Sequence, residues 1–439
     1  GLACALIHLP DILLLDEPTT GVDPLSRRDF WQIMGRLGRE RGMTVLLTTP
    51  YLDEAERCHR VALMARGRLL VTGSPEALKS QVPGRPRHEP ALEDLFVALM
   101  APRDGPPPFP SVQPVPAAPR AAPEDARIVE VRGLTKRFGA VTAVEDVTFD
   151  VLPGEIFGLL GPNGAGKTTT IKMLTGILRP TGGHGWIAGY DVGSQAEEVK
   201  AAIGYMSQRF SLYPDLTVTE NLGLYARVYG LASRRKRERQ EAVIATVGLV
   251  PWRGALARDL PLGIRQRLAL ACAILHEPRI LFLDEPTSGV DPLARQEFWN
   301  LIVTLSRTQK VTILVTTHYM KETERCDRLA LIHRGRLVAL GEPGALRRQA
   351  EAHRGRVLEV DAPGFREAAA ALEAAYPDLA LFGRRSHLRS LDPDADRQRV
   401  LAVLAHAGAG EAQVRTVPMS MDEVFATLIE SGGGDRAVA

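Results

Sequence analysis

Short runs of apolar residues, each ending in glycine, charged or hydroxyl residues, predict buried strands in this chain. Three such runs are Ile156–Leu160, Ile280–Leu283 and Val311–Val315. Each run is long enough for a strand and too short for a typical helix. Strands of a parallel sheet are covered on both faces, so their sequences are almost continuously apolar rather than alternating. The pattern therefore predicts an α/β domain with a parallel core sheet.

Part of this pattern occurs twice. Residues 15–19, Leu-Asp-Glu-Pro-Thr, match residues 283–287 without a gap, at an offset of 268 (284 − 16). The same offset pairs Phe30-Trp31 with Phe298-Trp299. A repeat of this kind predicts a duplicated domain, of which the first copy is the rear half. Because the chain starts with Gly1 rather than Met, we expect further sequence upstream.

The composition of successive segments predicts four parts. Residues 1–100 hold the partial first copy, and the proline-rich residues 101–127 form a linker. Residues 128–350 hold a complete copy. Residues 351–439 show the order βαββαβ of a small α+β appendage. Because Met419–Phe425 echoes Pro90–Phe96, the appendage is interpreted as an insertion before a closing helix.

Charge and composition narrow the range of partners. The formal net charge is +2 for 439 residues, so we expect no nucleic-acid partner. No apolar run approaches the roughly 18 to 20 residues that span a bilayer, so any membrane function requires a separate protein. The four cysteines, Cys4, Cys58, Cys272 and Cys326, have no Cys-x-x-Cys spacing and are predicted to be buried structural thiols.

A phosphate-binding loop follows the apolar run 156–160. It reads Gly161-Pro162-Asn163-Gly164-Ala165-Gly166-Lys167-Thr168, and a helix is predicted over Thr169–Ile177. Glycines let backbone N–H groups converge on phosphate oxygens, and the start of a helix adds positive potential. Lys167 is expected to reach the β and γ phosphates and Thr168 to place a hydroxyl on Mg²⁺.

Two carboxylates close the apolar run at 280–283. Asp284 and Glu285 are expected at the carboxyl edge of the parallel sheet. Because adjacent strand residues point to opposite faces, the two side chains cannot share one role. We expect Asp284 to hold the magnesium and Glu285 to orient or deprotonate the attacking water.

Together these motifs resemble the ATPase subunits of ATP-binding-cassette (ABC) transporters, over nearly the whole chain. The resemblance implies a P-loop NTPase fold with ATP and Mg²⁺ as cofactors. It implies that Gln208 contacts Mg²⁺ or the attacking water and that His318 contacts the γ-phosphate. Phe138 is implied to stack on adenine, and Thr169 to join residues 161–168 at the nucleotide. The competing interpretations are an ordinary loop glutamine, a core histidine and a core phenylalanine.

The resemblance also implies partners and a location. Nucleotide domains of the family pair around two ATP molecules, so the two copies are expected to pair within one molecule. A separately encoded integral-membrane permease is expected, with this chain in the cytoplasm at the inner face of the membrane. Phe210–Leu231 is then the surface that receives the permease, although its apolar content also suits core packing. The appendage and the tandem copies resemble subunits that serve drug-export permeases.

The sequence departs from the family pattern at two places. The signature segment has Pro261 where serine is usual and Leu262 where the first glycine is usual. The residue paired with His318 in the first copy is Pro50, which cannot hydrogen-bond a phosphate. In the family's pairing both defects fall in one site, so we expect one site to hold ATP and the other to hydrolyse it. The first copy's signature is expected just before Gly1, so this chain is predicted to bind Mg-ATP at Lys167 but to hydrolyse it poorly alone.

Two alternatives to a transporter subunit stay open. A soluble ABC ATPase acting on ribosomes or DNA usually carries a charged linker or a coiled coil, and the short proline-rich linker argues against it. An ATP-gated regulatory module with little hydrolysis is suggested by Pro50, Pro261 and Leu262. Single-turnover hydrolysis separates this module from an enzyme.

Overall fold

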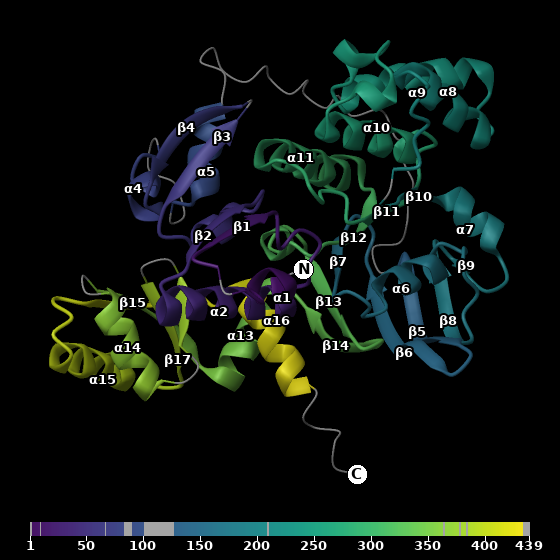
Figure 1. Ribbon diagram of the computed structural model, residues 1–439. Coiled ribbons are helices and arrows are strands. Elements are labelled where there is room, and N and C mark those ends of the chain that lie inside the picture. Colours follow the sequence, from purple (N-terminus) through teal and green to yellow (C-terminus); the bar gives the residue numbers. More distant parts are fainter. Residues whose placement is uncertain are drawn as a thin grey trace. The chain divides into compact units, whose positions relative to one another are not determined.

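The computed structural model describes residues 2–8, 10–65, 67–82, 90–100, 127–208, 210–362, 365–376, 379–382 and 385–432. They belong to two compact units, one of residues 1–101 with 347–439 and one of residues 102–346 (Figure 1). The predicted linker, residues 101–127, lies outside the described residues except for Arg127.

A six-stranded sheet forms the centre of the unit 102–346. The strand order is β10-β11-β12-β7-β13-β14, and only β14 runs antiparallel to its neighbour. All side chains of β7, β11 and β12 are buried, which is why these stretches are apolar on both faces. The predicted α/β fold is confirmed. The strands are β7 (Ile156–Leu160), β10 (Ile203–Met206), β11 (Ile280–Asp284), β12 (Thr312–Thr316), β13 (Arg328–His333) and β14 (Arg336–Gly341).

A second, antiparallel sheet packs against the first across a shared core. Its order is β6-β5-β8-β9, with β5 (Val129–Phe138), β6 (Val141–Val151), β8 (Gly182–Ile187) and β9 (Tyr190–Asp191). Phe149 of β6 stacks on Phe157 of β7 with ring centroids 5.2 Å apart. Helices α6 (Lys167–Leu174) and α7 (Ala196–Ala202) accompany this part of the unit.

The remaining helices of this unit include a group of three between β10 and β11. They are α8 (Val218–Val228), α9 (Ser233–Thr246) and α10 (Leu262–Ile274) (Figure 1). α8 begins with a complete capping box, in which Thr217 and Glu220 satisfy each other's backbone N–H groups. Farther along the chain are α11 (Pro292–Gln309), α12 (Met320–Thr323) and α13 (Pro343–Arg354).

In the other unit, the first hundred residues repeat the element order of residues 280–347. Strands β1 and β2 form a parallel pair, and β3 and β4 an antiparallel pair. Among the described residues each pair is a separate two-stranded sheet. The elements are α1 (Leu2–Leu6), β1 (Ile12–Asp16), α2 (Pro24–Arg41), β2 (Thr44–Thr48), α3 (Leu52–Ala55), β3 (Val61–Ala65), β4 (Arg68–Gly73), α4 (Pro75–Lys79) and α5 (Leu92–Met100).

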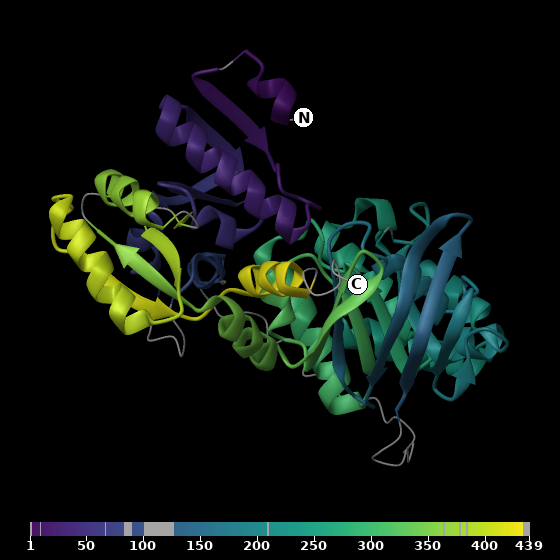
Figure 2. The same cartoon turned by 90° about the horizontal axis from the view of Figure 1, so that it is seen from below.

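The appendage has the element order βαββαβ that its sequence predicts. Its sheet order is β16-β17-β15-β18, and α14 and α15 cover one face (Figure 2). Leu358, Leu372, Leu388 and Val400 share the core between sheet and helices. The elements are β15 (Arg356–Asp361), α14 (Phe365–Ala375), β16 (Ala380–Phe382), β17 (Arg385–Ser390), α15 (Pro393–His406) and β18 (Gln413–Val417), followed by α16 (Met421–Gly432).

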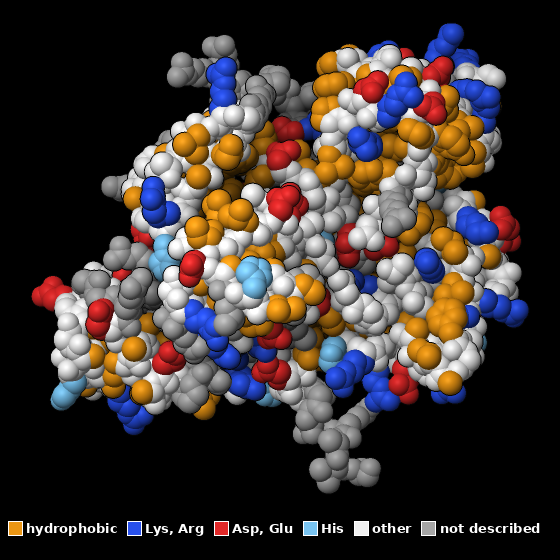
Figure 3. Space-filling view, in the orientation of Figure 1, with side chains coloured by type: hydrophobic (Ala, Val, Ile, Leu, Met, Phe, Trp, Pro, Cys, Tyr) orange, Lys and Arg blue, Asp and Glu red, His pale blue; other side chains and the backbone are white. Residues whose placement is uncertain are grey.

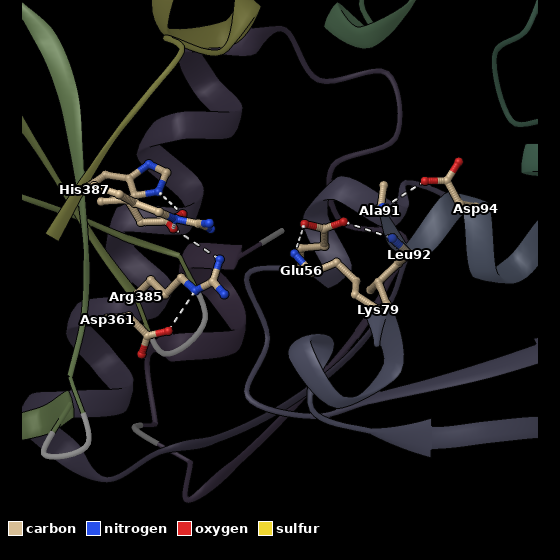
Figure 4. Close-up of polar contacts among 10 residues, drawn as sticks. Glu56, Lys79, Ala91, Leu92, Asp94, Asp361, Arg385 and His387 are labelled. Carbon is tan, nitrogen blue, oxygen red and sulfur yellow. Dashed lines mark hydrogen bonds and ion pairs between the residues drawn. The ribbon is translucent and has the colours of Figure 1, made fainter. Parts of the chain in front are cut away.

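The other face of the appendage's sheet carries a charged cluster around Glu359. This carboxylate accepts hydrogen bonds from His387 (3.1 Å), Arg385 (3.2 Å) and Arg415 (2.7 Å). Burial acts to raise the pKa of Glu359, but these partners lower it to about 2. Figure 4 shows Arg385 and His387 of this cluster, with Asp361 bonded to Arg385.

A second polar cluster, around Glu56, joins α4 to the start of α5 within the first hundred residues. Glu56 accepts from Lys79 Nζ (3.1 Å) and from the backbone N–H of Leu92 at the start of α5 (Figure 4). The N–H of Ala91 bonds the carboxylate of Asp94, so the first turn of α5 is capped from its own side.

The cysteines follow the prediction only in part. Cys272 and Cys326 are buried and Cys58 is half-buried, but Cys4 is exposed on the short helix α1. The prediction of buried thiols is wrong for Cys4, because the neighbouring described side chains of α1 are themselves only half-buried. In the parts of the chain that the structure describes, no helix combines the length and apolar character needed to cross a bilayer.

Candidate functional site

The loop Gly161–Thr168 connects β7 to α6 and is shaped by glycines. Gly166 has φ +105° and lies directly before α6. A Cβ at Gly166 would lie 2.6 Å from the carbonyl oxygen of Ala143, so the position admits only glycine. This turn starts the helix at Lys167, two residues before the predicted Thr169. The helix ends at Leu174, before the predicted Ile177, because Gly176 adopts φ +68°.

Lys167 folds back over its own loop. Its Nζ lies 2.6 Å from the carbonyl oxygen of Gly161 and 3.0 Å from that of Pro162, and the side chain is buried. Asn163, Gly164 and Thr168 are exposed, while Thr169 is half-buried in the first turn of α6. The loop therefore offers solvent-facing backbone and a hydroxyl beside one fixed ammonium group.

Phe138 lies at the end of β5, in the hairpin that borders this loop. It pairs with Val141 at the start of β6, and Ala143 of β6 is the strand residue that contacts Gly166. The ring is 51% exposed and Lys136 Nζ lies 5.2 Å from its centroid. This exposure contradicts the core-packing interpretation of Phe138 and is compatible with stacking on a planar ligand.

Asp284 is the last residue of β11, and Glu285 follows it outside the strand. Asp284 is buried, and its Oδ1 accepts a hydrogen bond of 2.7 Å from Thr316 Oγ1. Burial raises the pKa of Asp284, and the neighbouring charge of Glu285 raises it further, against the effect of Lys167. Glu285 leaves the strand with φ +48°, and its backbone N–H donates to Thr316. That left-handed turn directs the two carboxylates differently.

Gln208 and His318 converge on Glu285. Gln208 Nε2 donates to Glu285 Oε2 at 2.8 Å, and His318 Nδ1 lies 3.3 Å from the same oxygen. Burial acts to raise the pKa of Glu285, but the hydrogen bond and charge of His318, together with Lys167 and Gln208, hold it below its ordinary value. The carboxylate is thus ionised at neutral pH and can accept a proton or a hydrogen bond from water.

The side chains at this site fit a nucleotide phosphate with a hard divalent cation. Asp284 supplies one buried carboxylate, and Thr168 and Gln208 supply exposed oxygen atoms. Mg²⁺ is usually held by one or two carboxylates plus substrate phosphates rather than by a full protein cage. The described residues contain no group of three or more His, Cys, Asp or Glu that could hold a metal.

Sequence reasoning missed Thr316. This residue bonds the carboxylate of Asp284 and the backbone of Glu285, so it fixes both acidic groups. The signal was present in the repeat, since Thr48 occupies the paired position and its Oγ1 bonds Asp16 Oδ1 at 2.5 Å. A hydroxyl at the end of the strand next to an Asp-Glu pair is the pattern to look for.

The signature segment starts α10. Pro261 is the residue before the helix and makes no side-chain capping bond, and Leu262 begins the helix with its side chain exposed. A Cβ at Gly263 would lie 2.7 Å from Ala294 Cβ, so the remaining glycine permits close packing of α10 on α11. The hydroxyl that serine would supply before α10 is absent from this segment.

Comparison with known proteins places this chain in a family. Residues 144–288 match the family model described as "ABC transporter". The chain is 42% identical over 405 residues to "Probable multidrug ABC transporter ATP-binding protein YbhF" of Escherichia coli (strain K12), covering 80% of the chain and 70% of that protein. It is 36% identical to "Daunorubicin/doxorubicin resistance ATP-binding protein DrrA" of Streptomyces peucetius, covering 72% of the chain and 96% of that protein.

A solved "ATP binding subunit of ABC transporter" is also similar. It is 34% identical, covers 51% of the chain and 92% of its own, and has a TM-score of 0.47.

The chain therefore belongs to the ATP-binding proteins of ABC transporters. It has the α/β fold of P-loop ABC ATPases and is an ATP-hydrolysing transporter subunit that binds ATP.

Proposed function

We propose that this chain powers the export of a drug-like small molecule through a separately encoded membrane permease. The similarity to proteins named for multidrug transport and for daunorubicin and doxorubicin resistance supports this substrate class. The single observation that carries the proposal is the convergence of Gln208 and His318 on Glu285, beside Lys167 and Asp284. This arrangement suits hydrolysis rather than nucleotide storage alone.

In the proposed reaction, the side chains divide the work as follows. Lys167 binds the β and γ phosphates. Asp284, Thr168 and Gln208 would hold Mg²⁺, which would neutralise charge on the phosphates. Glu285 accepts a proton from the attacking water, while His318 holds Glu285 and contacts the γ-phosphate. Phe138 stacks on adenine, and the residues Gly161 to Thr169 wrap the phosphates.

The permease is proposed to dock on the segment 210–231, at the inner face of the membrane. Tyr213 and Val228 are exposed there, and Figure 3 shows hydrophobic side chains gathered over the α8–α10 lobe. Gln208, which bonds Glu285, lies two residues before the start of this segment. A movement of the docked surface would thus reach the carboxylate through one side chain.

We further infer that residues 1–100 are part of a second nucleotide domain that pairs with the domain 128–350. The coincidence of element bounds at the offset of 268 supports this. A site that contains Pro50, Pro261 and Leu262 lacks a histidine and a signature hydroxyl. Such a site retains ATP, whereas the site at Glu285 turns it over.

The test is a search beside the gene for a multi-span membrane protein, followed by a measurement of ATP-dependent transport by the chain together with that protein. Inverted membrane vesicles should accumulate a fluorescent anthracycline when Mg-ATP is added. The Lys167→Ala variant should not, because its phosphates are not bound. A regulatory module would bind ATP without hydrolysing it in a single turnover, and a permease-free ATPase would hydrolyse ATP at a rate that the permease does not change.

A further inference from the structure

The loop that carries His318 is held by a buried carboxylate that the site as described above does not include. Glu322 lies on α12, next to this loop, and is 2% exposed. Its oxygens accept hydrogen bonds from Thr287 Oγ1 (2.5 Å) and Thr317 Oγ1 (2.6 Å). Thr287 closely follows Glu285, and Thr317 directly precedes His318. One carboxylate therefore ties together the two segments that carry the reacting groups.

Arg295 extends this network to a third segment. Its Nε lies 3.8 Å from Glu322 Oε1, and its Nη2 donates to the carbonyl oxygen of Val290 at 3.0 Å. Its guanidinium stacks over the ring of Tyr319, 4.4 Å from the centroid. The pair therefore also holds the loop 289–291, which starts α11.

The contacts of Glu322 are strong because they are buried and because their acceptor is a carboxylate. Hydrogen bonds to an ionised acceptor are roughly twice as strong as neutral ones. Removing the charge leaves two hydroxyl donors and a buried guanidinium with a weaker partner. A displacement of about 1 Å at a reacting group slows catalysis by roughly two orders of magnitude. Weaker hydrogen bonds from Thr287 and Thr317 to Glu322 should therefore change the positions of Glu285 and His318.

We propose that Glu322 is a positioning residue for ATP hydrolysis, which fixes His318 relative to Glu285 without touching the nucleotide. The inference rests on the roles proposed above for these two side chains. It assigns a task to a residue that none of the sequence motifs includes.

The first hundred residues contain a matched control. Glu54 accepts from Thr19 Oγ1 (2.6 Å) and Thr49 Oγ1 (2.9 Å), and Arg27 Nε lies 3.3 Å away. The network is the same, but Pro50 stands where His318 would be. Glu54→Gln therefore removes an equivalent buried charge with no histidine to misplace.

The test compares single-turnover Mg-ATP hydrolysis and binding of a fluorescent ATP analogue in variants of the full chain, with each rate expressed relative to the slow hydrolysis expected of the wild-type chain alone. Glu322→Gln should slow hydrolysis about 10- to 100-fold and leave the Kd for the analogue within about twofold. Glu54→Gln should change the hydrolysis rate less than about twofold. The double variant Glu322→Gln/His318→Ala should be no slower than His318→Ala, because residues that act through one group are not additive.

Two further variants keep the test decisive if Glu322→Gln folds poorly. Thr317→Val removes one bond to Glu322 and should slow hydrolysis about 3- to 10-fold, while Thr49→Val should not. Multiplicative effects in the double variant, or equal losses from Glu54→Gln, would overturn the positioning role. A wild-type rate in Glu322→Gln alone would overturn it too, and the assignment of His318 would stand. Wild-type rates in both His318→Ala and Glu285→Gln would instead overturn the proposed site.

Discussion

Residues 12–79 and 280–347 have the same local structure but a different degree of burial. Their helices and strands begin and end at positions related by the offset of 268, with two exceptions: β13 starts one residue earlier than β3, and α13 continues to Arg354 whereas α4 ends at Lys79. Glu17 and Glu285 both adopt left-handed turns, with φ of +43° and +48°. Yet Phe282 of β11 is fully buried, whereas Leu14, at the same position of β1, is 70% exposed.

The difference shows which structural features form within each stretch alone and which require additional strands beside it. Turns and the buried Thr-Glu-Arg networks form in both places because all of their members lie inside each of the two repeated stretches, 12–79 and 280–347. Burial of β11 and β12 requires β10 and β7 on either side. Strand β7 and the loop it carries have no counterpart among the described residues 2–100, where β1 pairs with β2 alone.

The largest expected effect is on the rate of ATP hydrolysis, and it distinguishes Asp284-Glu285 from Asp16-Glu17. Glu285→Gln should slow single-turnover hydrolysis about 10²- to 10⁴-fold, because the amide cannot accept a proton from water. Glu17→Gln should leave the rate within about twofold, since Pro50 replaces the histidine beside it. Phosphate release in a quenched-flow experiment measures both rates. Equal losses would mean that the two pairs contribute alike and that the site is not asymmetric.

The next effect is on the free energy of unfolding, and it distinguishes strand β11 from strand β1. Phe282→Ala should lower the free energy of unfolding by about 3–5 kcal/mol, because it leaves a cavity in a filled core. Leu14→Ala should change it by less than about 0.5 kcal/mol, because the side chain already faces solvent. Urea titrations followed by tryptophan fluorescence give both values. A large loss from Leu14→Ala would show that β1 is covered in solution.

A smaller effect concerns the pH dependence of stability near Arg27, the residue paired with Arg295 by the offset of 268. Arg27 lies 4.0 Å from a second carboxylate, Asp422 of α16, whose pKa burial raises from 3.8 to about 6. A carboxyl with a raised pKa binds its proton more tightly in the folded protein. Its contribution to stability is therefore full below about pH 4 and is lost as the pH rises through about 6.

The Asp422→Asn variant removes this titration. Its stability relative to wild type should increase by up to about 2 kcal/mol between about pH 4 and pH 8, as measured by urea unfolding at each pH. Glu93, the second residue of α5, is half-buried and is the matched position. Glu93→Gln should show no comparable rise, and an equal rise in both variants would contradict the assignment to Asp422.

The last comparison concerns neither stability nor activity. It compares the rates at which the paired cysteines react with a thiol reagent. Cys4 is exposed and should react first with a chromogenic disulfide, while Cys272, its pair, is buried. Burial raises the pKa of the Cys58 thiol to about 11, so it should react at least about tenfold more slowly than Cys4. Cys326 should react only on unfolding. Mass spectrometry of labelled peptides gives the order, and early labelling of Cys326 would mean that β13 opens readily.

Much of the fold was predictable because its signals are local and strong. The apolar runs at 156–160 and 280–283 identified core strands, since only a strand covered on both faces needs such sequences. The ends of α6 were misplaced by two or three residues, because the φ angles of Gly166 and Gly176 decide them and sequence periodicity does not report φ.

The candidate site was predictable only as a set of residues. That Gln208 and His318 share one oxygen of Glu285 depends on the order of β10, β11 and β12 in the sheet, which motifs do not contain. Thr316 and Glu322 lay outside every motif, because a hydroxyl or a carboxylate in a buried network has no distinctive spacing. Their roles depend on contacts between segments distant in sequence.

The sheet of the appendage has a consequence for how this chain could have lengthened. Its first strand, β15, and its last, β18, lie side by side, with Val357 paired to Val417. The chain therefore enters and leaves the appendage at one place, and Arg347 of α13 bonds the carbonyl of Met419 just beyond the exit. A segment with adjacent ends can be gained or lost without moving the helices on either side. Adjacent ends are what the predicted insertion of the appendage before its closing helix requires, because a short turn from Gly355 to Pro418 could replace it.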